Sequence, residues 1–82
     1  MTYQIIWDDP ALAAASRFFK DDPHGLQQVF ASVDLLADDP RPSGAAAYGP
    51  TVYRMRVGFY RVIYEITEST VTIMIMHLGR AA

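Results

Sequence analysis

The sequence predicts a two-layer α+β domain, with two N-terminal helices packed on one face of a mainly antiparallel four-stranded sheet. The chain has 82 residues, of which 51% are hydrophobic, and this suits a single domain spanning residues 1–82. Apolar residues recur at helical spacing only within residues 9–37, whereas residues 2–7 and 51–78 alternate with a period of two. The predicted element order is therefore β-α-α-β-β-β.

The N-terminal elements are delimited by aspartate and proline. Residues 2–7 alternate and are rich in β-forming side chains, so they are expected to form the first strand. Asp9-Pro10 then supplies an N-cap and a proline at the first helical position, which predicts a short helix ending near Lys20. The expected apolar face of this helix carries Leu12, Ala15 and Phe19.

The second helix begins at the same kind of signal, Asp22-Pro23, and ends before Asp38-Asp39-Pro40. Its apolar stripe at helical spacing consists of Leu26, Val29, Phe30, Val33, Leu36 and Ala37. Residues 40–50 are rich in proline, glycine and alanine, which predicts a loop. As the longest irregular segment, this loop is a plausible surface for a partner or a substrate.

Three strands are expected in the C-terminal half, at about 51–57, 59–66 and 70–78. The first two form a hairpin, and Val57-Gly58 is predicted as its two-residue turn. In this register Arg54 lies opposite Arg61, and Arg56 lies opposite Phe59. The expected core face carries Tyr53, Met55, Tyr60, Val62, Tyr64 and Ile66.

The opposite face of this hairpin is strongly basic. Arg54, Arg56 and Arg61 share it, and no acidic residue lies between residues 53 and 64; we call this surface the arginine face. Like charges opposed on a sheet are destabilising, so an anionic ligand explains the arrangement best. Phosphate is the leading candidate because guanidinium groups bind it through two hydrogen bonds. The alternative is a solvated face whose arginines serve only solubility.

The charge distribution limits the possible partners. Residues 1–40 carry a balance of −5 and residues 41–82 a balance of +3, within a net charge of −2. The basic half suits a polyanion partner, while the overall balance argues against strong non-specific nucleic-acid binding. The chain has no cysteine and no long apolar run, so neither disulfides nor a membrane span is expected and the cytoplasm is the default compartment. Two distant histidines predict no metal site, and no cofactor is expected.

His77 is the residue near the arginine face whose side chain type titrates close to neutral pH. A three-residue turn at 68–70 would place His77 opposite Arg61, whereas a two-residue turn at 68–69 would place it on the core face. The second register buries more β-branched surface and is favoured. Glu65 has the parity of Arg61 but lies roughly 13 Å from it along the strand, so a solvated or cross-strand role beside an arginine is expected.

Two further groups of side chains have expected positions. Trp7, at the end of the first strand, is expected at the edge of the core rather than as a platform for stacking RNA bases. Met74 and Met76 are expected on the uncovered sheet face, where they could meet an apolar partner segment.

The element order, together with Tyr-Arg-Met-Arg-Val-Gly-Phe-Tyr-Arg-Val-Ile-Tyr at residues 53–64 and the closing strand Val71 to Arg80, resembles the RelE/ParE superfamily of bacterial toxins. The Tyr60–Tyr64 segment is the most specific part, and the resemblance is closest to RelE-type mRNA interferase toxins. It implies a ribosome-dependent endoribonuclease that drives a ribose 2′-hydroxyl onto the adjacent phosphate. In that mechanism Arg61 and Arg80 would hold the scissile phosphate.

The resemblance also implies that Arg54 and Arg56 share RNA binding and orient the nucleotide. His77 is the remaining catalytic candidate, because arginine is effectively never deprotonated and cannot act as a conventional base. The chain departs from RelE-type members in lacking lysine at the positions of Arg54 and Arg56. No tyrosine follows Tyr64.

Members of this superfamily are normally paired with an antitoxin in the bacterial cytoplasm. The arginine face beside Met74 and Met76 suits an acidic, amphipathic antitoxin segment. Three functions remain open for the chain itself. It could cleave mRNA on the ribosome as RelE-like toxins do, inhibit DNA gyrase without catalysis as ParE-like toxins do, or be an inactive relative that binds only its antitoxin.

Overall fold

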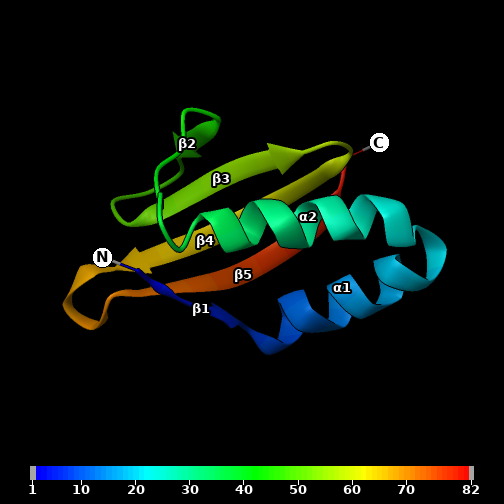
Figure 1. Cartoon of the computed structure of the whole chain (residues 1–82), viewed down its shortest axis with the longest axis horizontal. Helices are drawn as coiled ribbons and strands as arrows, with labels where there is room; N and C mark the ends of the chain where they lie inside the picture. Colours follow the sequence, from blue (N-terminus) through cyan, green and yellow to red (C-terminus); the bar gives the residue numbers. More distant parts are fainter. Residues whose placement is uncertain (1, 82) are drawn as a thin grey trace.

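The structure is a computed structural model and describes residues 2–81. Its elements in chain order are β1 (Gln4–Trp7), α1 (Asp9–Asp21), α2 (Pro23–Leu35), β2 (Ala45–Ala47), β3 (Val52–Val57), β4 (Tyr60–Thr67), a short 3-10 helix (Glu68–Thr70) and β5 (Thr72–Arg80). Both helices lie on the same face of the sheet, and the end of β5 lies beside the β3–β4 turn (Figure 1). The predicted two-layer α+β class is confirmed.

The sheet has five strands in the order β1-β5-β4-β3-β2. β1 runs parallel to β5, and the other neighbours are antiparallel. The fifth strand, β2, lies inside the segment predicted as a loop, so the expected count of four strands was wrong. Its three alanines have neither alternation nor β-propensity, and the strand forms because its backbone pairs with the edge of β3.

The first helix begins one residue earlier than predicted and presents a different face. Asp8 is its N-cap, with a side chain that accepts from the Asp9 amide at 3.0 Å. The buried side chains of α1 are Ala11, Ala14 and Ala15. Leu12 and Phe19, expected in the core, are 51% and 41% exposed. Small alanines let the helix approach the sheet closely, and this leaves the larger side chains at its border.

The second helix presents most of its predicted stripe to the sheet, although Phe30 is half-buried and the helix ends at Leu35, so that Leu36 and Ala37 lie in the following turn. Asp22 caps it by accepting from the Gly25 amide at 3.0 Å, and Leu26, Val29, Val33 and Leu36 are fully buried. These side chains pack against the predicted core face of the sheet. Five of the six residues expected on that face are buried, and Tyr53 is half-buried. Trp7 is half-buried and packs edge-on against Phe30 at 5.6 Å between ring centroids, as expected for the core edge.

The β3–β4 hairpin turns one residue later than predicted. Arg56 pairs with Arg61 and Arg54 with Ile63, so the turn consists of Gly58-Phe59. Gly58 has φ of +59°, which glycine adopts without steric cost. Because the register differs by two residues, each side chain keeps its predicted face. The arginine face therefore exists as expected, although its directly opposed pair is Arg56 with Arg61.

A β-bulge divides β5 into two halves. Tyr64 pairs with Ile75 and Ile63 with His77, so the pairing passes over Met76. The turn before β5 is also longer than either predicted turn, since Thr67 pairs with Thr72. The bulge moves His77 to the exposed side of the sheet. The favoured expectation that His77 lies on the core face was therefore wrong.

Candidate functional site

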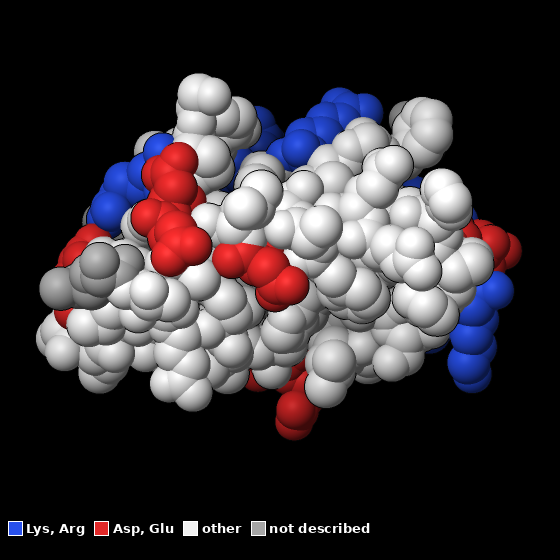
Figure 2. Space-filling model, viewed as in Figure 1, with Lys and Arg blue, Asp and Glu red and all other residues white. Residues whose placement is uncertain are grey.

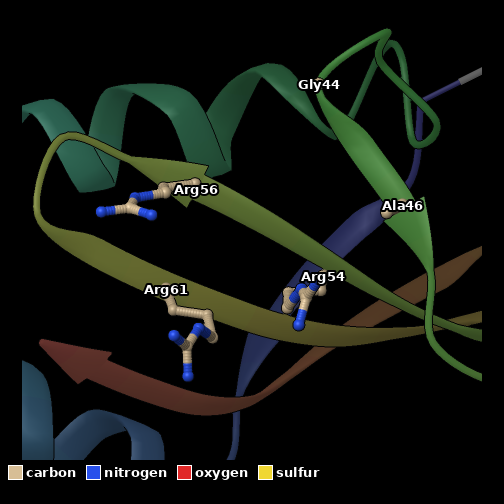
Figure 3. A pocket seen from close by; sticks show the side chains of 5 residues that line it. All are labelled: Gly44, Ala46, Arg54, Arg56 and Arg61. Carbon is tan, nitrogen blue, oxygen red and sulfur yellow. The ribbon is translucent and has the colours of Figure 1, made fainter. Parts of the chain in front are cut away.

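The arginine face lines a shallow hollow on the side of the sheet away from the helices. Gly44, Ala46, Arg54, Arg56 and Arg61 surround about 250 Å³ of open space. Figure 3 shows the three arginine side chains standing on the same side of β3 and β4. Arg56 lies directly opposite Arg61, while Arg54 lies between Ala46 of β2 and Ile63 of β4. The small residues of the β2 side leave the guanidinium groups accessible.

None of these three arginines has an acidic partner within residues 2–81. The two ion pairs of that region join Arg41 to Glu68 and Arg80 to Asp21, both at 2.8 Å. Arg56 makes only a long hydrogen bond, 3.4 Å from Nε to the Gly58 carbonyl oxygen. Most guanidinium donors of the arginine face are thus free for an anion, which they can bind through paired hydrogen bonds.

The face covered by the helices has a different charge pattern. Figure 2 shows it as mostly neutral, with acidic groups on its surface and basic groups chiefly at its rim. The sheet therefore separates a helix side with acidic groups from a side that carries three arginines, none of which has an ion pair in the described part of the chain. An anionic ligand is attracted to the second side.

His77 lies on the arginine face, one strand away from Arg61. It pairs with Ile63, and the next outward residue along β5 is Gly79, which pairs with Arg61. The imidazole leans over Gly79, since a Cβ built there would lie 2.9 Å from His77 Nε2. The absence of a side chain at Gly79 thus lets the ring approach the position opposite Arg61. The structure brings together four of the five predicted site residues: Arg54, Arg56, Arg61 and His77.

Arg80 is the predicted site residue that lies elsewhere. It pairs with Tyr60 on the helix side of the sheet, where it donates to Asp21 Oδ2 at 2.8 Å and to the Tyr60 hydroxyl at 3.1 Å. Its guanidinium also lies over the Phe18 ring at 4.8 Å. The expectation that Arg80 and Arg61 hold one phosphate fails, because the bulge in β5 turns Arg80 to the opposite face.

Arg80 instead belongs to a network that ties β5 to the turn between the helices. The Tyr60 hydroxyl accepts from Arg80 and donates to Asp22 Oδ2 at 2.9 Å. The pKa of Asp22 is lowered because two hydrogen bonds favour its charged form. The larger effect comes from the Gly25 amide and the smaller from the Tyr60 hydroxyl. The pKa of Tyr60 is raised, mainly by burial and to a smaller extent by the hydrogen bond to Asp22. This network holds the strand that carries His77.

Two acidic residues near the sheet are engaged at a distance from the three arginines, Glu65 on the same side of the sheet but towards the other end of β4. Glu65 is half-buried and accepts from Thr51 Oγ1 at 3.1 Å, so its partner is a threonine rather than the expected arginine. Glu68 accepts from Tyr3 and from Arg41 at the far end of the sheet, and these hydrogen bonds lower its pKa. Neither carboxylate neutralises the hollow.

Sequence reasoning missed Tyr48, whose ring lies 5.8 Å from the guanidinium carbon of Arg54. Tyr48 lies two residues after Ala46 and therefore on the same side of the sheet, but no pattern in the sequence indicated that β2 exists. Within residues 2–81 no cluster of three His, Asp or Glu side chains could hold a metal ion. No helix in the same range is long and apolar enough to cross a membrane.

A helical pair on one side of a mixed sheet and unpaired arginines on the other define a class of small α+β domain with a cationic sheet face. Within that class, the chain belongs to the family described as the ParE toxin of type II toxin-antitoxin systems, whose model matches residues 5–82. The chain is thus a toxin of the RelE/ParE superfamily, and the predicted superfamily is confirmed. A search of curated proteins found no similar sequence.

Solved structures of toxins share the fold. The isolated RelE toxin of E. coli is similar with a TM-score of 0.82 at 19% identity, over 98% of this chain and 85% of that one. In the RelBE2 toxin-antitoxin complex of Mycobacterium tuberculosis, a chain is similar with a TM-score of 0.82 at 20% identity, covering 100% and 94%. A chain of the chromosomal ParDE system of P. aeruginosa has a TM-score of 0.79 at 13% identity, covering 99% and 98%. RelE and ParE toxins thus share this architecture.

Proposed function

We propose that this toxin is a RelE-like, ribosome-dependent mRNA endoribonuclease. The observation that supports the proposal is the arginine face, where three guanidinium groups without an ion pair among residues 2–81 and an exposed imidazole lie on one uncovered side of the sheet. A fold gains no stability from opposing Arg56 and Arg61, so a ligand with several negative charges accounts for that pair. The backbone phosphate of RNA is such a ligand.

The proposed reaction is transphosphorylation within the RNA. The 2′-oxygen forms a bond to the adjacent phosphorus, the bond from phosphorus to the 5′-oxygen breaks, and the products are a 2′,3′-cyclic phosphate and a free 5′-hydroxyl. Arg56 and Arg61 bind the non-bridging oxygens, where negative charge grows in the transition state. Arg54 binds the neighbouring backbone and aligns the attacking and leaving oxygens.

His77 is the proposed proton acceptor. Its ring leans over Gly79, beside the position of Arg61, and a neutral imidazole there can take the proton from the 2′-hydroxyl. The leaving 5′-oxygen receives a proton from solvent. Arg80 acts indirectly in this scheme, because its contacts with Asp21 and Tyr60 anchor the strand that carries His77.

The proposed partner is an antitoxin with an acidic, amphipathic segment. Free guanidinium groups on the arginine face attract acidic side chains, while the half-buried Ile63 and Met74 offer apolar contacts on the same side of the sheet. Similar chains occur in solved toxin-antitoxin complexes, including RelBE2 of Mycobacterium tuberculosis. An antitoxin bound there would block the RNA site directly. The proposed compartment is the bacterial cytoplasm, where mRNA is translated.

A second function, inhibition of DNA gyrase without catalysis, is favoured by a separate observation. The matching family model is that of the ParE toxin, and arginine stands at positions 54 and 56, where RelE-type toxins have lysine. Gyrase inhibition needs a binding surface but neither a proton acceptor nor a transition-state site. His77 would then be dispensable.

Two assays on the same preparations separate these functions. Primer extension on a translated mRNA detects cleavage, and a supercoiling assay with purified gyrase detects inhibition. Wild type and a variant such as Arg17→Gln, which loses an exposed α1 charge distant from the site, should cut mRNA only during translation. Arg56→Gln and His77→Gln should lose most of that cleavage. Intact mRNA together with blocked supercoiling would refute the nuclease proposal and support the alternative.

A further inference from the structure

Tyr48 is an exposed aromatic side chain at the border of the arginine face. It follows Ala47, the last residue of β2, and 60% of its surface is exposed. Ala46 pairs with Arg54, so Tyr48, two residues further, falls on the same side of the sheet. The Arg54 guanidinium lies over its ring, 5.8 Å from the centroid. The ring therefore extends the hollow formed by the arginines.

Backbone hydrogen bonds hold the residue that carries this ring at the edge of the sheet. The amides of Tyr48 and Gly49 both donate to the Val52 carbonyl oxygen, at 2.8 and 3.1 Å. Within residues 2–81 the Tyr48 hydroxyl makes no hydrogen bond, and the ring is not part of the packed core. Gly44 and Ala46 leave the neighbouring hollow open. An exposed ring that adds nothing to the core is available for a ligand.

We propose that Tyr48 is a base-stacking residue for single-stranded RNA, with a phosphate of the same strand held by Arg54 and its neighbours. This assignment rests on the proposed function and deepens it. A nucleotide presents a planar base beside an anionic phosphate, and Tyr48 with Arg54 presents an aromatic plane beside a guanidinium. Bases stack on aromatic rings with little sequence dependence, so the ring adds affinity and aligns the strand across the arginine face.

Phe59 provides a matched control. It is also an exposed aromatic, at 71%, and belongs to the β3–β4 turn. Its surroundings differ, because it borders hollows on the helix side together with Asp21 and Asp22. Two carboxylates against the single cation of Arg80 leave this hollow net negative, which disfavours a phosphate strand. Phe59→Leu therefore removes an exposed ring of similar size without touching the proposed stacking position.

The test is an NMR titration of the full chain with a short single-stranded RNA and with the same RNA lacking one internal base. NMR suits a chain of this size and measures weak affinities. Tyr48→Leu should weaken binding of the intact RNA by about 5- to 150-fold. Tyr48→Phe should retain the wild-type affinity, and so should Phe59→Leu. Removal of the base should weaken binding to wild type but change little for Tyr48→Leu.

The possible outcomes separate this assignment from the nuclease proposal. Equal affinities of wild type and Tyr48→Leu, or an equal loss in Phe59→Leu, would overturn the stacking role even if cleavage occurs. A wild type that binds no RNA in the titration overturns it as well. If the Tyr48 pattern holds while translated mRNA stays intact, the stacking role stands and only the nuclease chemistry fails.

Discussion

Replacing Arg61 by glutamine should stabilise the fold while removing its proposed function. Arg61 lies directly opposite Arg56, and neither has an acidic partner within residues 2–81. Opposed side chains on neighbouring strands have Cβ atoms roughly 5 Å apart, and like charges in that position cost about 0.2–1 kcal/mol. Glutamine keeps part of the aliphatic stem and removes the charge. For a domain of this size the melting temperature should rise by about 1–8 °C.

Calorimetry at low salt measures this gain, and Arg17→Gln is the matched control. Arg17 is exposed on α1 and has no ion pair in the described part of the chain, so the control makes the same change in net charge. It should leave the melting temperature nearly unchanged. The gain in Arg61→Gln should shrink in 1 M salt, where the Debye length falls to about 3 Å. A variant less stable than wild type, or a gain equal to that of Arg17→Gln, would show that Arg56 and Arg61 do not repel each other.

Three further predictions concern the tyrosine network, alkaline stability and His77. Tyr60→Phe removes the hydroxyl between Arg80 and Asp22 and should lower the unfolding free energy by about 1–2 kcal/mol in urea titrations. Burial raises the pKa of Tyr64 to about 12, so the folded state favours the neutral phenol. The resulting stabilisation is complete below pH 10 and should be lost as the pH rises to 12. In melts at alkaline pH, Tyr64→Phe should show a smaller loss of stability than wild type. His77→Gln should slow mRNA cleavage by about 100- to 10,000-fold in single-turnover assays on programmed ribosomes.

The elements with strong periodicity were predictable because one face of each is buried. In β4 the buried Tyr60, Val62, Tyr64 and Ile66 alternate with more exposed side chains, so the pattern in the sequence matches the pattern of burial. Helix α2 shows the same agreement at helical spacing. The arginine face followed from parity alone, and a shift of two residues in the hairpin register did not change it.

The features that escaped prediction lack such a signal. Residues 73–76 are uniformly apolar, so nothing in their pattern indicates that the pairing passes over Met76. This single bulge exchanges the faces of His77 and Arg80, and thereby decides the composition of the site. In α1 the buried residues are alanines, whose small side chains give a weaker hydrophobic signal than the exposed Leu12 and Phe19. Strand β2 forms by pairing with β3 and depends on tertiary context.

The most direct test of the central claim is the rate of mRNA cleavage on programmed ribosomes, measured in single turnovers. Wild type and the control Arg17→Gln should cut at equal rates, whereas Arg61→Gln should be slower by about 100- to 1000-fold, the usual cost of removing one donor to a transition-state oxyanion. Because Arg61→Gln is expected to be at least as stable as wild type, unfolding cannot account for that loss. Equal rates for Arg61→Gln and wild type, or no cleavage by the wild type, would contradict a phosphate site on the arginine face.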